Sequence, residues 1–455
     1  MRVKPFNQEK IKSEVLSFLK SNGKSNITSL KRHFPYSQSF FSRIFKILDE
    51  EIVILGKARE TEYAAKRIIE GKNSSYPIYE ILEDSSSLKI GILYAIEPKG
   101  FYFLSHLKNI SSEYSADLPY FLNDLRPSGF LGHLVPNLNP ELNLPKDIRI
   151  WSSEHCLKYL TAKSFDNIGN LIIGDLAFQK YLSQKTQPNG IEFLKRSELY
   201  ELYANHVLSY GEPGSSAGGE QPKFLSNLLP QNKQVLVKFS PPLHSDIGIR
   251  VADLLICEHL ALNTLRKNNV ESSQSEIIFT KNRVFLELER FDRIPNLGRK
   301  GVISLGSLDA EFSGTMGTWS ETSINLMKKK IIPKEFYNEI RFLELFGYFI
   351  GNNDMHLFNL SFYFSKNKII KLAPVYDMLP MLFRPMNNQI IPKVFSPPLP
   401  LPEDSNIWDK AYILANQFWN AVLNDKNISS SFKEIAQDCL LILNKQKDIG
   451  KLLPK

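Results

Sequence analysis

Residues 350–362 concentrate polar side chains between two hydrophobic stretches. Asn353, Asp354, His356 and Asn359 all lie within this short segment, directly after an almost wholly apolar run. An unpaired buried polar group costs about 1–3 kcal/mol, so such a cluster needs a chemical reason. Carboxylate and amide oxygens suit proton transfer and the binding of a hard metal ion. The segment is therefore the first candidate for a catalytic site.

The spacing within the segment indicates which reaction it could catalyse. Asp354 precedes Asn359 by five positions, which is the spacing of aspartate and asparagine in the HRDxxxxN catalytic loop of protein kinases. In that loop the aspartate accepts the proton of the attacking hydroxyl, and the asparagine holds a metal ion. Eighteen residues after Asn359, Asp377 closes an apolar run that we expect to be a strand. This is where the aspartate of a kinase DFG motif would meet Mg²⁺, so the residues predict phosphoryl transfer.

A metal-dependent hydrolase built on Asp354, His356 and Asp377 is the main enzymatic alternative. It leaves a loop at residues 211–224 unexplained. This loop, GEPGSSAGGEQPKF, contains four glycines and two serines, and glycine lets backbone N–H groups converge on phosphate oxygens. The loop does not match GxxxxGK[ST], which disfavours a P-loop NTPase. Taken alone it is weak support, because most such loops are only turns.

The hydrolase alternative also leaves Lys238 unexplained. Lys238 lies in an alternating strand predicted for residues 234–239, where a kinase keeps its phosphate-binding lysine. An exposed strand lysine fits this feature equally well, because strands commonly have one polar face. Glu258, in the following helix, is either a partner of Lys238 or a surface residue. The buried strand predicted for residues 284–289 would lead into the hinge of a two-lobed kinase, and the order of all these features favours a kinase.

Residues 1–70 predict three helices followed by a β-hairpin. Apolar residues recur at helical spacing in residues 7–21, a short second helix is expected with Thr28 as its cap, and Ser37 caps the third. The 70 residues carry 14 lysines and arginines against 8 aspartates and glutamates. This excess of positive charge suits a polyanion such as DNA. The pattern predicts a winged helix-turn-helix domain.

The third helix and the hairpin tip offer side chains that can reach bases and phosphates. The predicted DNA-binding residues are Gln38, Ser39, Ser42, Arg43 and Lys46 on the helix and Lys57 and Arg59 on the hairpin. The alternative is a winged helix that docks on proteins and never meets DNA.

The chain of 455 residues fits several domains. After a linker at residues 71–75 we predict a strand-rich accessory subdomain at 76–180. A kinase-like first lobe is predicted at 181–295 and a mostly helical second lobe at 296–455. The expected fold class is therefore α+β and multidomain.

The composition predicts a soluble cytoplasmic protein. No apolar run approaches the roughly 18 residues needed to cross a membrane, and the first residues do not form a signal-peptide core. Cys156, Cys257 and Cys439 are scattered without metal-ligand spacing. We therefore expect buried cysteines in a reducing compartment, with neither a disulfide framework nor a zinc site.

Several stretches resemble the HipA-like kinases and, more closely, their YjjJ branch. The matching stretches are GSSAGGEQPKF, VLVKF, LELERFD, NNDMHLFNLSFY and LAPVYDMLPM, together with LGKARETEYA, LNDLRPSGFLG and DIRIW nearer the N-terminus. The resemblance covers nearly the whole chain. It implies a two-lobed serine/threonine protein kinase that uses ATP and Mg²⁺ and has a bacterial toxin-like role.

The resemblance also implies roles for individual residues. By the family pattern Asp354 is the catalytic base, with Lys238 and His356 in the catalytic group, and Asn359 and Asp377 are the magnesium ligands. Ser215 or Ser216 would be autophosphorylated, which switches such kinases off. The implied ATP-binding residues are Ser215, Ser216, Ala217, Gly218, Gly219, Lys238, Glu289, Phe291, Asn359 and Asp377.

The resemblance implies partners as well. Translation components such as aminoacyl-tRNA synthetases are expected protein substrates by analogy. Founding members of the family use a separate DNA-binding antitoxin, so an antitoxin is a further candidate partner beside the DNA-binding N-terminus. Two other functions stay open from the residues. One is a transcriptional regulator whose kinase-like part senses nucleotide without phosphoryl transfer, and the other is a small-molecule phosphotransferase.

Overall fold

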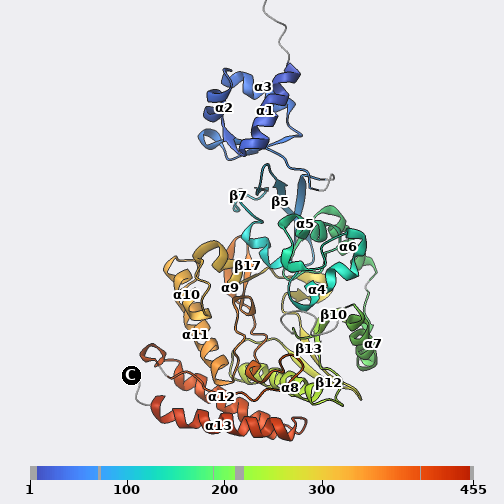
Figure 1. Cartoon of the computed structure of the whole chain (residues 1–455), viewed down its shortest axis with the longest axis vertical. Coiled ribbons are helices and arrows are strands. Elements are labelled where there is room, and N and C mark those ends of the chain that lie inside the picture. The colour runs from blue at the N-terminus through green and yellow to red at the C-terminus, as the bar shows by residue number, and fades with distance from the viewer. Residues whose placement is uncertain (1–7, 70–72, 188, 211–219, 400, 451–455) are drawn as a thin grey trace, which may run out of the picture.

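The computed structural model describes residues 8–69, 73–187, 189–210, 220–399 and 401–450. The molecule is elongated, and Figure 1 shows the N-terminal helices at one end and the last two helices at the other. Between them lie a sheet-containing middle unit and two lobes. We describe these parts in chain order because each contributes a surface to the candidate site.

The N-terminal unit combines three helices with a small antiparallel sheet of order β1-β3-β2. The elements are α1 (Gln8–Asn22), β1 (Ser25–Asn26), α2 (Ile27–His33), α3 (Gln38–Ile47), β2 (Ile52–Leu55), a short 3₁₀ turn (Ala58–Glu60) and β3 (Glu62–Ala65). Ser37 caps α3 as predicted, since its side chain accepts a hydrogen bond from the N–H of Phe40. The predicted Thr28 cap is wrong. Asn26 caps α2 instead, because its side-chain oxygen reaches the N–H of Ser29 at 2.9 Å.

The hairpin of the N-terminal unit packs on the middle unit. Val53, Leu55 and Ala64 form a small buried cluster with Ile96 and Tyr102 of the middle sheet. A hairpin face that is buried in this way cannot also contact DNA. Its tip and the exposed side of α3 remain available for a ligand.

The middle unit contains a five-stranded antiparallel sheet of order β7-β6-β5-β4-β8, with helices on its flanks. Its strands are β4 (Ser75–Ile81), β5 (Ser87–Ala95), β6 (Phe101–Ser105), β7 (Glu113–Ser115) and β8 (Leu171–Ile173), and its helices are α4 (Gly129–Leu138), α5 (Ser153–Ala162) and α6 (Asp175–Thr186). The prediction of a strand-rich region is therefore wrong for its second half. These helices are short, and α4 carries Pro136 in its interior, so their sequence signal is weak.

The first lobe is built on a second five-stranded sheet of order β12-β13-β11-β10-β9. Its strands are β9 (Ile191–Glu192), β10 (Lys223–Leu229), β11 (Lys233–Phe239), β12 (Ser275–Phe279) and β13 (Val284–Glu289), and its helices are α7 (Arg196–Ser209) and α8 (Asp246–Lys267). Helix α8 is buried without interruption from Arg250 to Glu258. It therefore offers a polar residue such as Glu258 no route to solvent.

The second lobe is mostly helical, with short strands at its entrance. Its strands are β14 (Arg293–Ile294), β15 (Gly298–Arg299), β16 (Val302–Ser304), β17 (Ser361–Ser365) and β18 (Lys368–Leu372), and its helices are α9 (Leu305–Leu308), a π-helical turn (Asp309–Ser313), α10 (Trp319–Lys328), α11 (Lys334–Phe349), α12 (Trp408–Asn424) and α13 (Ser430–Gly450). One large hydrophobic core joins this lobe with α8 and the middle unit.

Cys156, Cys257 and Cys439 are buried and unbonded, as predicted. Over the described part of the chain, no helix combines the length and the apolar character that crossing a membrane requires.

Candidate active site

Lys238 lies at the centre of a buried ion-pair cluster. Its Nζ contacts both carboxylate oxygens of Glu258, at 2.8 and 2.7 Å, and it also donates to Oδ1 of Asp377. The side chains of Lys238 and Glu258 are only 5% and 0% exposed. Lys238 is thus neither an exposed strand lysine nor unpaired, and Glu258 of α8 is its partner.

The electrostatics of this cluster hold Lys238 and Asp377 in their charged forms. Burial alone would raise the pKa of Asp377, but the positive charges of Lys238 and Lys223 outweigh it and bring the pKa to about 2. Burial alone would lower the pKa of Lys238, but Asp377 and Glu258 raise it overall. Burial raises the pKa of Glu258 despite the opposing charge of Lys238. Of the three side chains, Glu258 therefore depends most on its ion-pair partner Lys238 to keep its charge.

Asp377 lies in a loop and not at the end of a strand. Strand β18 ends at Leu372, so the expectation that Asp377 closes a strand is wrong. Its backbone has φ of +52°, in the left-handed region that few residues other than glycine, asparagine and aspartate adopt readily. The backbone carbonyl of Asp377 accepts a hydrogen bond from Nδ2 of Asn352 at 3.3 Å.

Asn352 links Asp377 to the polar segment after α11. Its side chain is buried, and its Oδ1 accepts the N–H of Asp354 at 3.1 Å. Nδ2 of Asn359 in turn donates to the backbone carbonyl of Asp354 at 2.9 Å. The side chain of Asp354 itself is exposed to solvent. One buried amide therefore fixes the backbone at both predicted acidic residues, while the Asp354 carboxylate faces outward.

His356 has a less direct relation to this arrangement. Its backbone carbonyl accepts a hydrogen bond from Nε1 of Trp319 at 3.0 Å, which anchors the segment to α10. Its side chain is exposed, and its charge contributes to lowering the pKa of Asp377. Among the described residues we find no hydrogen bond between the His356 ring and Asp354.

The two predicted metal ligands, Asp377 and Asn359, offer oxygen donors, which fit magnesium better than a transition metal. The side-chain nitrogen of Asn359 donates to the backbone carbonyl of Asp354, so the side-chain oxygen of Asn359 points away from that carbonyl. A carboxylate and an amide oxygen are the ligands that Mg²⁺ accepts together with water and phosphate oxygens. Across the described residues, no group of three or more His, Cys, Asp or Glu side chains could hold a metal ion.

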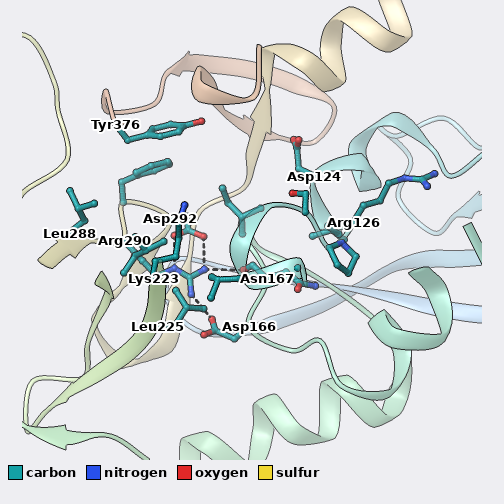
Figure 2. A pocket seen from close by; sticks show the side chains of 18 of the residues that line it. Asp124, Arg126, Asp166, Asn167, Lys223, Leu225, Leu288, Arg290, Asp292 and Tyr376 are labelled. Carbon is teal, nitrogen blue, oxygen red and sulfur yellow. Dashed lines mark hydrogen bonds and ion pairs between the residues drawn. The ribbon is translucent and has the colours of Figure 1, made fainter. Parts of the chain in front are cut away.

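A cavity of about 370 Å³ opens beside the cluster. Asp377 and Tyr376 line it together with Leu288, Glu289, Arg290 and Phe291 at the end of β13. The rings of Phe291 and Tyr376 stack with centroids 5.6 Å apart. Figure 2 shows Tyr376 and Leu288 on the same side of this cavity. The predicted hinge residues Glu289 and Phe291 and the predicted metal ligand Asp377 therefore share one cavity.

The sheet of the first lobe covers the cavity. Lys223 pairs opposite Lys238 and Leu225 opposite Leu236 in the antiparallel strands β10 and β11. Directly opposed residues project to the same face of a sheet. The cavity is lined on this side, its roof, by Lys223, Leu225 and Leu236. Along β10 the roof is therefore apolar at Leu225 and positively charged at Lys223.

Several of the hinge backbone groups are already occupied. The N–H of Glu289 donates to the carbonyl of Gln274 at 2.9 Å, and the N–H of Arg290 donates to Gln234 at 3.0 Å. The carbonyl of Phe291 accepts a hydrogen bond from the hydroxyl of Tyr363 at 3.1 Å. Fewer backbone groups of this segment are therefore available to bind adenine than the sequence suggested.

Part of the predicted site lies outside the described residues. This applies to Ser215, Ser216, Ala217, Gly218 and Gly219. The chain is described again from Glu220, and Gln221 donates from Nε2 to the carbonyl of Phe239 at 2.6 Å. The segment that follows the glycine-rich loop is thus fixed to the end of β11, one residue from Lys238.

The sequence interpretation missed three residues of the site. Lys223 lines the cavity, Asn352 positions Asp354 and Asp377, and Arg384 lies close enough to Asp354 for their charges to interact. Lys223 stands in the quoted motif GEQPKF, and its position opposite Lys238 could have been found by pairing the two predicted strands. Asn352 is the first residue of the quoted stretch NNDMHLFNLSFY, but no local pattern reveals its role or that of Arg384, because both roles depend on contacts between distant segments.

The predicted DNA-binding residues are all exposed. Gln38, Ser39, Ser42, Arg43 and Lys46 lie exposed on α3, and Lys57 and Arg59 are exposed at the hairpin tip. Of these cations, none forms an ion pair with a residue that the structure describes. Their charge is therefore available to an external anion.

Known proteins resemble the chain over most of its length. A family model described as the YjjJ-like toxin middle domain matches residues 72–182, and one described as the HipA-like C-terminal domain matches residues 215–439. The protein named Toxin YjjJ from Escherichia coli K12 is 33% identical over 428 residues, covering 93% of this chain and 96% of that protein.

A solved structure has a similar fold. HipA of Shewanella oneidensis, determined in a complex with HipB and operator DNA, is 15% identical, with a TM-score of 0.52. The match covers 83% of this chain and 98% of that one. An identity this low supports the fold and leaves the family to be decided by the closer relative. With a HipA-like C-terminal domain, a matching middle domain and a relative aligned nearly end to end, the chain belongs to the YjjJ-like toxins of the HipA-like family.

Proposed function

We propose that this chain is an ATP- and magnesium-dependent serine/threonine protein kinase with a toxin-like role. The observation that carries the proposal is the buried contact of Lys238 with both Glu258 and Asp377 beside a cavity lined by hinge residues. Phosphoryl transfer needs a lysine held by a glutamate and an acidic metal ligand at one place. Lys238 is placed to contact the phosphates, and Glu258 orients it.

Mg·ATP would supply the transferable phosphoryl group and the metal charge that neutralises it. Asp377 and Asn359 would hold the metal through their oxygens. Asp354 would accept the proton of the attacking hydroxyl, and its exposed carboxylate suits a protein substrate that arrives from solvent. The apolar roof formed by Leu225 and Leu236 would cover the adenine base of ATP.

Residues outside this cavity extend the proposal. Ser215 and Ser216 are the proposed sites of autophosphorylation, and a cytoplasmic translation component is the proposed external substrate. The exposed cations of α3 and the hairpin tip support DNA binding by a winged helix-turn-helix domain. The HipA structure contains an antitoxin protein and DNA, and by analogy we propose both kinds of partner here.

Mass spectrometry of the full-length protein after incubation with Mg·ATP tests the proposal. We expect a phosphate on Ser215 or Ser216 in the wild type and none in Asp354→Asn. Asp409→Asn, which changes an exposed aspartate of α12, is the matched control and should label like the wild type. Bound ATP without labelling of the protein or of an added substrate would favour a nucleotide-sensing regulator.

A further inference from the structure

The cavity beside Asp377 has a wall that the two lobes do not supply. Besides the lobe residues, it is lined by the segment before α4 and by α4 itself, including Asp124, Arg126, Leu131 and Val135. All of these belong to the middle unit. In Figure 2 Asp124 and Arg126 lie on one side of the view, with Leu288 and Tyr376 on the other. The cavity is therefore closed by a third part of the chain.

The wall is fixed to the hinge by buried charges. Asp166 of the middle unit accepts from Arg290 at 2.8 Å and from Arg293 at 2.7 Å. The N–H of Gly169 donates to Asp292 at 2.8 Å, and Arg293 donates to the carbonyl of Gly169 at 2.9 Å. The guanidinium groups of both arginines are largely buried. Moving the middle unit away from the hinge would take Asp166 from both arginines and leave them Asp292 as their carboxylate partner. Removing one member of a buried ion-pair network in this way is costly.

Two further contacts fix the wall to the lobes. Asp124 accepts three hydrogen bonds from the second lobe, from the N–H and hydroxyl of Ser304 at 2.7 and 2.6 Å and from the hydroxyl of Ser307 at 2.8 Å. On α4, Nδ2 of Asn137 donates to the carbonyl of Tyr210 at 2.8 Å. The middle unit is thus anchored at the hinge, at α9 and at the end of α7, around the rim of the cavity.

We propose that the middle unit is part of the nucleotide site, and that Leu131 of α4 packs directly against the bound nucleotide. This inference rests on the proposed kinase function and adds a specificity-determining residue to it. Leu131 and Val135 are one helical turn apart and both line the cavity. Leu131 is only partly buried, so its side chain has room to gain contact with a ligand.

Titration calorimetry of the full-length protein with Mg·ATP tests the inference. Leu131→Trp should fill the cavity and weaken binding at least about tenfold, which corresponds to about 1.4 kcal/mol. Leu131→Ala should weaken binding by several-fold through lost apolar contact. Leu138→Trp is the matched control, because Leu138 lies on the same helix, is 46% exposed and does not line the cavity. It should bind within twofold of the wild type.

The outcomes separate this inference from the proposed function. Thermal melting of each variant shows whether it is folded, and Leu131→Ala carries the test if the tryptophan variant is not. A folded Leu131→Trp or Leu131→Ala that binds Mg·ATP like the wild type overturns the inference alone. Equal weakening by Leu138→Trp also overturns it, since the effect would then not come from the cavity. A wild type that binds no Mg·ATP overturns the kinase proposal and the inference together.

Discussion

Replacing Lys238 by methionine should destabilise the protein in a way that depends on pH. Methionine is unbranched like lysine and one heavy atom shorter, and it removes the charged ammonium group together with its hydrogen-bond donors. Glu258, which is fully buried, would lose the cation that both of its oxygens contact. A buried carboxylate without a partner avoids the cost of its charge by binding a proton. We therefore expect Glu258 to be protonated in the folded variant at neutral pH.

The size of the effect follows from the linkage between protonation and folding. A carboxyl group whose pKa is raised on folding binds a proton as the chain folds, so stability falls as pH rises. With an unfolded pKa near 4.3, the cost reaches up to about 3.7 kcal/mol at pH 7 and about 1 kcal/mol at pH 5. For a domain of about 200 residues, the melting temperature should fall by about 7–15 °C at pH 7 and about 2–4 °C at pH 5.

Scanning calorimetry of the wild type and Lys238→Met between pH 5 and 7 measures this difference. Lys238→Met combined with Glu258→Gln is the control. The glutamine is nearly isosteric and cannot titrate, so the pH dependence of the difference should disappear. A melting-temperature difference that stays constant between pH 5 and 7, or one that persists in the double variant, would refute the reasoning. The first result would mean that another cation, such as Lys223, compensates Glu258. The second would mean that another group that loses Lys238, such as Asp377, titrates in this range.

Three other variants probe separate parts of the structure. Asp292→Asn should cost about 3–5 kcal/mol, because Asp292 is a buried partner of two hinge arginines, and a lower melting temperature would show it. Asn359→Ala should raise the magnesium concentration needed for half-maximal phosphoryl transfer by about tenfold, the equivalent of one weak ligand at about 1.4 kcal/mol. Arg43→Gln with Lys46→Gln should lower the slope of log K against log salt for DNA by about 1.8, or about 0.9 for each lost phosphate contact.

Matched controls exist for these variants. Glu192→Gln removes an exposed pair with Lys195 and should change stability by less than about 1 kcal/mol. Lys281→Gln with Lys426→Gln removes the same charge from exposed positions outside the N-terminal unit and should leave the salt slope unchanged. If Asn359→Ala keeps the magnesium dependence of the wild type, Asn359 is not a metal ligand.

The elements that carry strong local signals could be predicted from the sequence. The Ser37 cap of α3 is found as predicted, because capping is a local property. Helix α4 shows the opposite case. It contains Pro136 and is only ten residues long, so its pattern does not distinguish it from the loops around it.

The site could be predicted in its residue types but not in its contacts. Lys238 and Glu258 are 20 residues apart in sequence, and Lys238 and Asp377 are 139 apart. Strand alternation gives the face on which Lys238 lies but not what covers that face. Leu131 lies in the matching stretch LNDLRPSGFLG, but the sequence does not reveal that this stretch forms a wall of the cavity, since the wall exists only where three parts of the chain meet.

The left-handed backbone of Asp377 limits which sequences this position can hold. Glycine adopts that conformation freely and asparagine and aspartate adopt it tolerably, whereas other residues would add about 1–2 kcal/mol of strain. Glycine supplies no oxygen ligand, and asparagine supplies one without charge. Among all residues, aspartate alone satisfies both the backbone and a cation. Random mutation at this codon should therefore almost always be deleterious, and Asp377→Asn is the substitution that separates the loss of charge from the loss of local structure.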